Sequence, residues 1–477
     1  MRERLRRNIS SKLVGEVASR LISFAFNLVL ARGLGAEGFG RYAYAYAFAA
    51  TLALCGELGL NTLLTQEAAR NREKAADYIR RFAPLRLASV AIVAATTVGL
   101  AFGAADPSRL LEIALLAVFM GANTLLDYHT AIFNAHERMV QEAKMRVATR
   151  IGVSLAGIAA VALKAPLLGV IAAVSIANLL AVLAGAAYRR RLGLYFGARW
   201  EPRFVGRALA TAVPVATASL AINLYFYVDN LLLEALGFAD AAIGEYGAAL
   251  KILEAAQGLP LVVVGGTFPV VAQLARSGTS QSLAPFFSRV SRLAMLVVLP
   301  ASGVGAILSP PVARLLFGPG FEAAGFSLAL LALATPFYFS NLVAIYLLIA
   351  AGRRWQASLS RLGALALKVA LVVALTPSLG VAGAAAAMIA TDGLLFFALF
   401  AGRCRAGLAE KGEGALLLKS GLAAAAALGV WAAVRGAGVA VEVLAVAAAF
   451  AVAFALLRPG RRPASAEPHV SHDGGPA

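Results

Sequence analysis

The sequence has few charged residues and very few cysteines and histidines. Of its 477 residues only 14% are charged and 60% are hydrophobic, whereas an average soluble domain is about 25% charged and 45–50% apolar. There are 2 cysteines and 4 histidines. This scarcity of charge excludes an ordinary soluble globular protein, because a soluble fold has too little interior to hide so much apolar surface from water.

Sequence motifs for catalysis and nucleotide use are also absent. The chain has no G-x-x-x-x-G-K-[ST] loop, no Cys or His cluster with metal-ligand spacing, and no polar stretch long enough for an ATPase domain. Cys55 falls in an apolar run and Cys404 in a basic loop, so we expect no disulfide. His469 and His472 belong to a Pro, Gly and Ser rich tail, which we expect to be flexible. We expect no enzyme activity, no metal and no cofactor.

Apolar runs of about 20 residues, each long enough to cross a bilayer core of roughly 30 Å, recur from end to end. They predict an all-α polytopic membrane protein with about 14 transmembrane helices, of which the last two are the weakest in pattern because they are rich in Ala. Twelve spans is the alternative. The predicted spans are 11–32, 38–64, 83–104, 110–134, 147–165, 167–188, 208–236, 246–275, 286–308, 325–350, 358–376, 381–402, 415–434 and 437–457.

The net charge of +18 comes from 43 Lys and Arg, and their positions decide what they bind. Most fall in alternate loops, such as RNREKAADYIRR and YRRRLGLYFGARWEPRFVGR, while the intervening turns are short and tend to be acidic. This pattern follows the positive-inside rule with both termini cytoplasmic. Because the charge is divided among many short loops, we expect anionic membrane lipids as partners and no nucleic acid.

The sequence of one turn occurs twice in the chain. LGAEGFGRYAYAY begins at Leu34 and joins the first two spans, and LGFADAAIGEYGAAL begins at Leu236 and joins the seventh and eighth. Both turns face the same side, so the chain predicts two pseudo-symmetric six-helix lobes related by an axis along the membrane normal. The predicted divisions are an N-terminal lobe 1–190, a cytoplasmic linker 191–207, a C-terminal lobe 208–402, two additional helices within 403–457 and a disordered tail 458–477.

Three stretches carry a family resemblance. ARGLGAEGFGRYAYAYAFAATLALCGELGLNTLLTQEAAR, YFYVDNLLLEALGFADAAIGEYGAALKILEAAQGLP, and LLFGPGF followed by PFYFSNLVAIYLLIAAGRRW resemble the Wzx-type polysaccharide flippases of the multidrug/oligosaccharidyl-lipid/polysaccharide exporter superfamily. The resemblance covers about residues 8 to 402. It implies a V-shaped two-lobe transporter that moves a lipid-linked oligosaccharide across the cytoplasmic membrane. The fourteen-span count is also similar to the lipid II flippase branch.

Charged side chains inside the spans are the candidate functional residues, because each costs about 2.5–3.5 kcal/mol at the centre of a membrane helix unless paired or hydrated. Arg20, Lys251 and Lys368 are the candidate substrate-binding cations, since a lipid-linked sugar carries a pyrophosphate and an Arg fork binds phosphate oxygens in pairs. Arg20 and Lys251 come from different lobes. The alternative is that Arg20 with Glu16, and Lys251 with Glu254, are structural pairs on one helix face.

Other polar residues in the spans suggest a coupling or relay role. Asp229, Asn27, Glu254 and Asp392 could carry a proton or a cation that couples transport to a gradient, although polar contacts between helices are the commoner explanation for such residues. An offset equal to that between Leu34 and Leu236 relates Asn27 to Asp229.

These features lead to three functional hypotheses. The first is a flippase for a polyprenyl-pyrophosphate-linked oligosaccharide, working by alternating access of two lobes in the cytoplasmic (inner) membrane. The second is a cation-coupled antiporter of small drugs or metabolites. The third is a membrane scaffold for glycan-assembly enzymes, and a glycan polymerase or glycosyltransferases are expected partners under the first hypothesis as well.

Overall fold

The computed structural model describes residues 2–57, 59–70, 72–104, 107–194, 197–256, 297–350 and 353–405, with a few further positions between 430 and 452. Throughout this part of the chain the secondary structure is helical. The helices of the first half are α1 (Arg2–Glu57), α2 (Leu60–Arg70), η1 (Arg72–Lys74), α3 (Ala75–Ala104), α4 (Pro107–Ala135), α5 (Met139–Ala162) and α6 (Leu167–Arg191). Those of the second half are α7 (Pro202–Ala235), α8 (Asp240–Ala256), α11 (Leu299–Phe317), α12 (Glu322–Ala350), α13 (Arg354–Leu379) and α14 (Ala382–Arg405).

Within the described residues, nine helices are long and apolar enough to cross a membrane. Large apolar side chains such as Phe102, Leu183 and Leu315 are exposed on them, as expected for a surface that faces lipid. The chain is therefore an all-helical multi-pass membrane protein. Most of the predicted spans 415–434, 437–457 and 246–275, and residues 286–296 of the predicted span 286–308, lie outside the described residues.

Both copies of the duplicated turn have the backbone conformation that their glycines predict. Gly35 has φ 69° inside α1, which is two helices joined at a kink, and Gly237 has φ 80° between α7 and α8. Positive φ is accessible to glycine at little cost, so each copy can reverse the chain between two spans. The prediction of two separate spans across residues 11–64 is thus correct at this turn.

Several helix boundaries differ from the predicted spans, and two of them have a local cause. Helix α1 ends at Glu57, whereas the predicted second span ran to residue 64, because Gly59 has φ 66° and breaks the helix before α2 begins. The ninth span continues to Phe317, well beyond residue 308, because α11 runs through Pro310 and Pro311. Neighbouring helices and side chains can compensate the backbone groups that proline leaves unbonded within a membrane.

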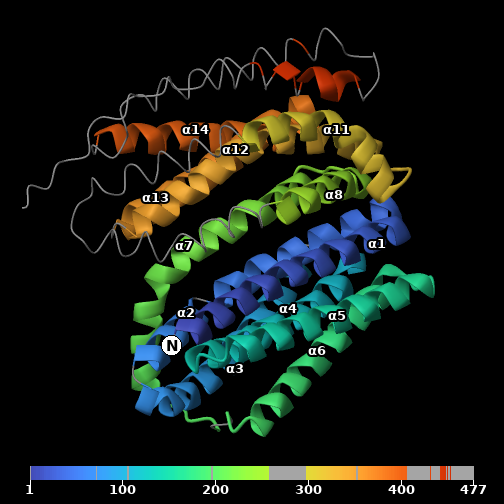
Figure 1. Ribbon diagram of the computed structural model, residues 1–477. Helices are drawn as coiled ribbons and strands as arrows, with labels where there is room; N and C mark the ends of the chain where they lie inside the picture. The colour runs from blue at the N-terminus through green and yellow to red at the C-terminus, as the bar shows by residue number, and fades with distance from the viewer. Residues whose placement is uncertain are drawn as a thin grey trace, which may run out of the picture.

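The helices form two bundles (Figure 1). In the N-terminal bundle α1 packs on α5 and α4, and α4 packs on α3 and α6. In the C-terminal bundle α12 packs on α11, α14 and α8, and α13 packs on α7 and α14. The bundles meet mainly where α1 lies along α8 and α7 (Figure 1).

The seam between the bundles is tightest where the two duplicated turns meet. Gly40 of α1 and Gly244 of α8 lie against each other with no side chain between their backbones, and Phe39 packs on Phe321 beside them with ring centroids 6.5 Å apart. We call this region the outer contact and define it by Ala36, Gly40, Asp240 and Gly244. It closes one end of the seam and leaves the site described below at the other.

Candidate functional site

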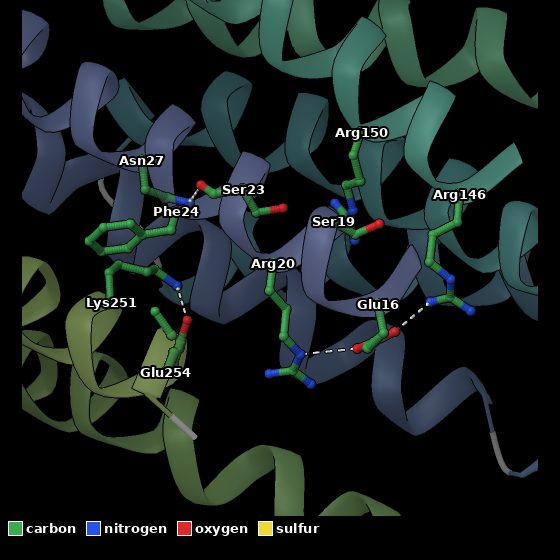
Figure 2. A pocket seen from close by; sticks show the side chains of 11 residues that line it. Glu16, Ser19, Arg20, Ser23, Phe24, Asn27, Arg146, Arg150, Lys251 and Glu254 are labelled. Atoms are coloured by element: carbon green, nitrogen blue, oxygen red, sulfur yellow. Dashed lines mark hydrogen bonds and ion pairs between the residues drawn. The ribbon is translucent and has the colours of Figure 1, made fainter. Parts of the chain in front are cut away.

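A polar pocket of about 160 Å³ lies at the seam between α1, α5 and α8 (Figure 2). Small residues let the helices approach there: Gly15 of α1 lies against Ala143 of α5, so that a Cβ on Gly15 would be 2.8 Å from the Cβ of Ala143. The lining residues are Glu16, Ser19, Arg20, Ser23, Phe24, Asn27, Arg146, Arg150, Lys251, Glu254 and Ala255. Both bundles therefore contribute to one pocket.

Four of the lining residues are cations and two are carboxylates, and most of them are paired. Arg20 Nε lies 3.1 Å from Glu16 Oε1 on α1, and Lys251 Nζ lies 2.9 Å from Glu254 Oε2 on α8. Each pair sits on one helix face, as the sequence spacing predicted. Lys251 is also 5.4 Å from the ring centroid of Tyr46, a cation–π contact. The pairs leave both cations at the pocket surface, where an anion could replace the carboxylate.

Arg146 and Arg150 come from α5 and were not among the predicted site residues. Arg146 is held by the buried carboxylate of Glu142, one turn before it, and lies 3.5 Å from Glu16. Arg150 forms no ion pair with any carboxylate in the described part of the chain. Figure 2 shows its side chain pointing toward Ser19.

The hydroxyl of Ser19 also has no partner among the described residues. Ser19 is 6% exposed, and its oxygen has no hydrogen-bond partner among the described residues. A buried polar atom without a partner is costly, so such atoms indicate a place where water or a ligand completes the hydrogen bonding. Among the described residues, the pocket thus combines a guanidinium that has no ion pair with a hydroxyl that has no hydrogen-bond partner.

The residue spacing along α5 could have identified both arginines as site residues from the sequence. Glu142, Arg146 and Arg150 are four residues apart and share one helix face, but the predicted span began at residue 147, so the first two were assigned to a cytoplasmic loop. The helix begins at Met139, about two turns earlier. Glu142 and Arg146, which the prediction assigned to a loop, are therefore part of a membrane helix that faces the seam.

Four of the predicted site residues meet in this pocket: Arg20, Lys251, Glu254 and Asn27. The side-chain amide of Asn27 donates to the carbonyl of Ser23 at 2.7 Å, so its amide oxygen remains available to the pocket. Asn27 does not lie with Asp229, although the repeat offset relates the two.

The other three predicted residues, Lys368, Asp229 and Asp392, lie inside the C-terminal bundle and are fully buried. Lys368 of α13 pairs with Asp229 of α7 at 2.8 Å and donates to the carbonyl of Tyr225 at 2.5 Å. Lys368, which the sequence predicts as a cation of the substrate cavity, does not line the pocket, and its ammonium group faces a carboxylate across the bundle.

Hydrogen bonds extend this buried group, which we call the buried ionic cluster: Tyr225, Asp229, Tyr246, Asn341, Lys368 and Asp392. Tyr246 donates to Asp229 at 2.5 Å, Tyr225 donates to Asp392 at 3.1 Å, and Asn341 donates to the same carboxylate at 3.2 Å. Two carboxylates and one ammonium thus share a closed network that joins α7, α8, α12, α13 and α14.

Comparisons with known proteins bear on what this arrangement does. The family model described as "Polysaccharide biosynthesis protein" matches residues 5–275. No curated protein matches the chain.

Solved structures show the same fold. The lipid II flippase MurJ in an inward closed conformation superposes with a TM-score of 0.71 at 12% identity, covering 93% of this chain and 97% of that one. An inward-facing multidrug resistance MATE family transporter gives a TM-score of 0.63 at 15% identity, over 82% and 95% of the two chains. An outward-facing one gives 0.54 at 15% identity, over 85% and 96%. At these identities the similarity establishes the fold shared by MurJ and the MATE transporters.

Proposed function

The chain belongs to the polysaccharide biosynthesis protein family, and we propose that it is a flippase that translocates a polyprenyl-pyrophosphate-linked oligosaccharide across the cytoplasmic membrane. The observation that carries the proposal is the pocket at the seam, where α1 and α5 of one bundle and α8 of the other supply Arg20, Arg146, Arg150 and Lys251. A pyrophosphate needs cations in a hydrated cavity, and guanidinium groups bind its oxygens in pairs.

The arrangement of the seam supports alternating access. The outer contact joins the bundles by backbone against backbone, whereas the pocket lies toward the N-terminal end of α1, which the positive-inside pattern places in the cytoplasm. The greater similarity to the inward-facing than to the outward-facing MATE structure agrees with this orientation. The anionic head would enter from the cytoplasmic side, and separation of the outer contact would release it on the other.

The charge distribution supports a cytoplasmic location for both termini and an inner membrane location. Arg189, Arg190 and Arg191 end α6, and Arg403 and Arg405 end α14. Both of these helix ends belong to segments that the rule places inside. The last span boundaries lie outside the described residues, so the C-terminal assignment rests on the sequence.

Binding would proceed by exchange of ion-pair partners. Glu16 and Glu254 hold Arg20 and Lys251 at the pocket surface, and the diphosphate would displace these carboxylates from the cations. Arg150, which has no carboxylate partner among the described residues, would meet the phosphate first, and Ser19 would donate its hydroxyl. Because Lys251 belongs to α8 and the arginines to α1 and α5, one bound anion would tie the bundles together.

The buried ionic cluster is the proposed coupling element. It links five helices of the C-terminal bundle through two carboxylates and one ammonium, and the buried guanidinium of Arg361 acts electrostatically on Asp392. Two positive and two negative charges are then balanced, so loss or gain of one proton would leave an uncompensated charge in a closed space. Such a charge favours rearrangement of the helices that surround it. Asp229 and Asp392 keep the relay role predicted from the sequence, while Asn27 and Glu254 belong to the substrate pocket.

A lipid II flippase is the second candidate, favoured by the TM-score of 0.71 with MurJ. Its substrate also carries a polyprenyl pyrophosphate, so the same cations would serve. A cation-coupled antiporter of small drugs is the third, favoured by the MATE fold. The excess of arginines in the pocket argues against a cationic drug as substrate.

The test is the location of lipid-linked glycan in cells depleted of the protein. We expect the intermediate to accumulate on the cytoplasmic leaflet, where it is protected from a glycosidase or lectin added outside, and its glycan then identifies the substrate. Re-expression of the wild-type chain should clear it, whereas Arg20→Ala with Lys251→Ala should not. Accumulation of lipid II would select the second candidate. Normal glycan distribution with reduced drug efflux would select the third, and clearance by the double variant would favour a scaffold.

A further inference from the structure

A second, smaller pocket lies within the C-terminal bundle, where α12 ends, α13 begins and α14 ends. It has a volume of about 80 Å³. The residues that line it are Ala344, Leu348, Arg353, Gln356, Ser360, Ala398, Leu399, Gly402 and Arg403. The lining thus has two arginines, an amide and a hydroxyl against an apolar wall, and it has no acidic residue.

The polar groups converge from two directions. Arg353, Gln356 and Ser360 lie three and four residues apart, at the start of α13, and so share one helix face. The backbone N–H of Arg353 donates to the carbonyl of Leu348 at 2.8 Å, which holds the turn between α12 and α13 in place. Arg403 enters from the last turn of α14 and is only 7% exposed. Two cations from separate elements are thereby held at one small cavity.

The amide of Gln356 is directed across the pocket. A Cβ on Gly402 of α14 would lie 3.9 Å from the Nε2 atom of Gln356, so the amide of α13 lies in van der Waals range of the backbone of α14. A phosphate group needs several donors around a compact volume, and guanidinium and amide N–H groups supply them.

Large apolar side chains next to the lining residues of this pocket are exposed. Trp355 is 66% exposed and Leu359 is 51% exposed on α13, and Phe397 is 59% exposed on α14. A tryptophan at a helix end with apolar side chains beyond it is typical of the boundary between headgroups and acyl chains. A ligand whose polar head enters the pocket would therefore have its tail beside these side chains.

We propose that this pocket binds the phosphate headgroup of an anionic phospholipid from the cytoplasmic leaflet, with Arg353 and Arg403 as its charge partners. Basic pockets between membrane helices on the cytoplasmic side are suited to such headgroups. The assignment to the cytoplasmic leaflet rests on the orientation given under the proposed function, but binding of the headgroup does not depend on transport. A soluble phosphate shares the same chemistry, and the apolar side chains next to the pocket favour the lipid.

The experiment uses Trp355 as the reporter. Trp200→Phe and Trp431→Phe leave it as the single tryptophan, and the purified full chain is placed in bilayers that contain brominated phosphatidylglycerol or brominated phosphatidylcholine. We expect phosphatidylglycerol to quench Trp355 with about fivefold higher relative affinity, and Arg353→Ala to reduce this preference to near one. A single basic residue near an anionic leaflet gives an effect of this size.

Controls separate a built site from general surface charge. Arg405→Ala removes an exposed cation from the same turn of α14 and should leave the preference unchanged. If Arg403→Ala fails to fold, Arg403→Lys and Gln356→Ala test the same pocket and should each lower the preference at least twofold. Equal loss in Arg405→Ala, or no preference in the wild type, overturns the proposal.

Inorganic phosphate at constant ionic strength distinguishes the two sources of the ligand. If millimolar phosphate reverses the quenching of Trp355 by brominated phosphatidylglycerol, the pocket is a soluble-anion site and the lipid assignment is wrong. The quenching is measured without a glycan substrate, so its failure leaves the proposed flippase function untouched, and failure of the glycan experiment leaves this one interpretable.

Discussion

Gly40 of α1 and Gly244 of α8 pack so closely against the opposite helix that neither position has room for a side chain. A Cβ built on Gly40 would lie 1.8 Å from the carbonyl oxygen of Asp240, and one built on Gly244 would lie 1.9 Å from the carbonyl oxygen of Ala36. The two copies of the duplicated turn thus meet across the seam in a reciprocal contact. Each copy supplies both the glycine and the carbonyl that the other needs.

Gly40→Ala and Gly244→Ala should each weaken closure of the outer contact. The added methyl meets backbone atoms, which cannot rotate away as a flexible side chain can, so α1 and α8 must separate. Overpacking of this kind costs about 1–3 kcal/mol, which shifts the balance between closed and open outer sides by roughly 5- to 150-fold. We expect glycan translocation to fall at least fivefold.

Labelling from outside the cell measures this shift directly. Cys55 and Cys404 are replaced by Ser, and Ser23→Cys places a thiol in the seam pocket. An impermeant maleimide should label it faster in the glycine variants than in the parent. Gly99→Ala on α3, where an added Cβ meets nothing within 4 Å, is the matched control. Unchanged labelling and full export in Gly40→Ala would show that the outer contact does not have to close.

Arg109 joins the bundles beside the same contact. Its guanidinium lies 2.5 Å from Glu234 at the end of α7 and 3.0 Å from Asp240 at the start of α8, and it stacks near the Tyr44 ring, 5.4 Å from its centroid. Arg109 itself lies in the first turn of α4. This group is partly buried, so it is less screened by water than a surface pair.

Arg109→Ala should therefore favour the outward-open state. Loss of hydrogen bonds to charged groups costs about 1.5–3 kcal/mol, and we expect labelling of the Ser23→Cys thiol from outside to rise about tenfold. Arg41→Ala is the matched control, because it breaks an ion pair of 2.7 Å with Glu112 inside the N-terminal bundle. A comparable rise in both variants would mean that general destabilisation, and not the connection between bundles, explains the effect.

The fold was predictable because its signals are local. A run of apolar residues specifies a membrane helix whatever surrounds it, and Gly35 and Gly237 specify their turns through backbone sterics alone. The same holds for the clustering of Arg20 with Glu16 and of Lys251 with Glu254, since residues three or four apart share a helix face. These features depend on neighbours in sequence.

The remaining features depend on which way a helix is rotated in the bundle. The sequence alone suggests that Lys368 is available to bind substrate. In the structure, however, Lys368 on α13 faces Asp229 on α7, and no local sequence pattern specifies that contact. Arg150 was missed for the opposite reason: it lies just inside a predicted span, among basic residues that resemble an ordinary cytoplasmic loop. Rotation is set by packing between distant segments, and only the structure supplies it.

Arg150 should be the most sensitive cation of the seam pocket. It forms no ion pair with a carboxylate in the described part of the chain, and it acts on Asp127 electrostatically without a direct contact. Its removal therefore breaks no ion pair, and the main loss is what it offers a ligand. We expect Arg150→Ala to reduce translocation of lipid-linked glycan by roughly 10- to 100-fold, the range given by hydrogen bonds to charged groups. Arg150→Lys should recover part of the loss, because it keeps the charge without the fork.

Translocation is measured in proteoliposomes by protection of labelled glycan from an added glycosidase. Lys144→Ala removes an exposed cation from the same helix outside the pocket, and it should translocate at the parental rate. Full activity in Arg150→Ala, with normal expression, would exclude Arg150 from substrate binding and leave the paired cations as the candidates.

Lys368 and Asp229 offer a test of whether the buried ionic cluster is structural or couples transport. Lys368→Met leaves the carboxylate of Asp229 buried and uncompensated, which costs about 3–5 kcal/mol, so thermal unfolding in detergent should begin several degrees lower. Lys368→Met with Asp229→Asn removes both charges at similar volume and should restore most of that stability. Lys144→Met, an exposed site, should change neither.

The double variant then separates the two roles. If the cluster only holds α7 and α13 together, restored stability should bring restored translocation, with its original dependence on an imposed proton gradient. If the cluster couples transport, the stable double variant should translocate slowly and at a rate that the gradient does not change, because the ion pair that would exchange the proton is absent. Since both variants are compared at equal folded protein, loss of gradient dependence cannot be attributed to unfolding, and its retention would remove Asp229 and Lys368 from the coupling mechanism.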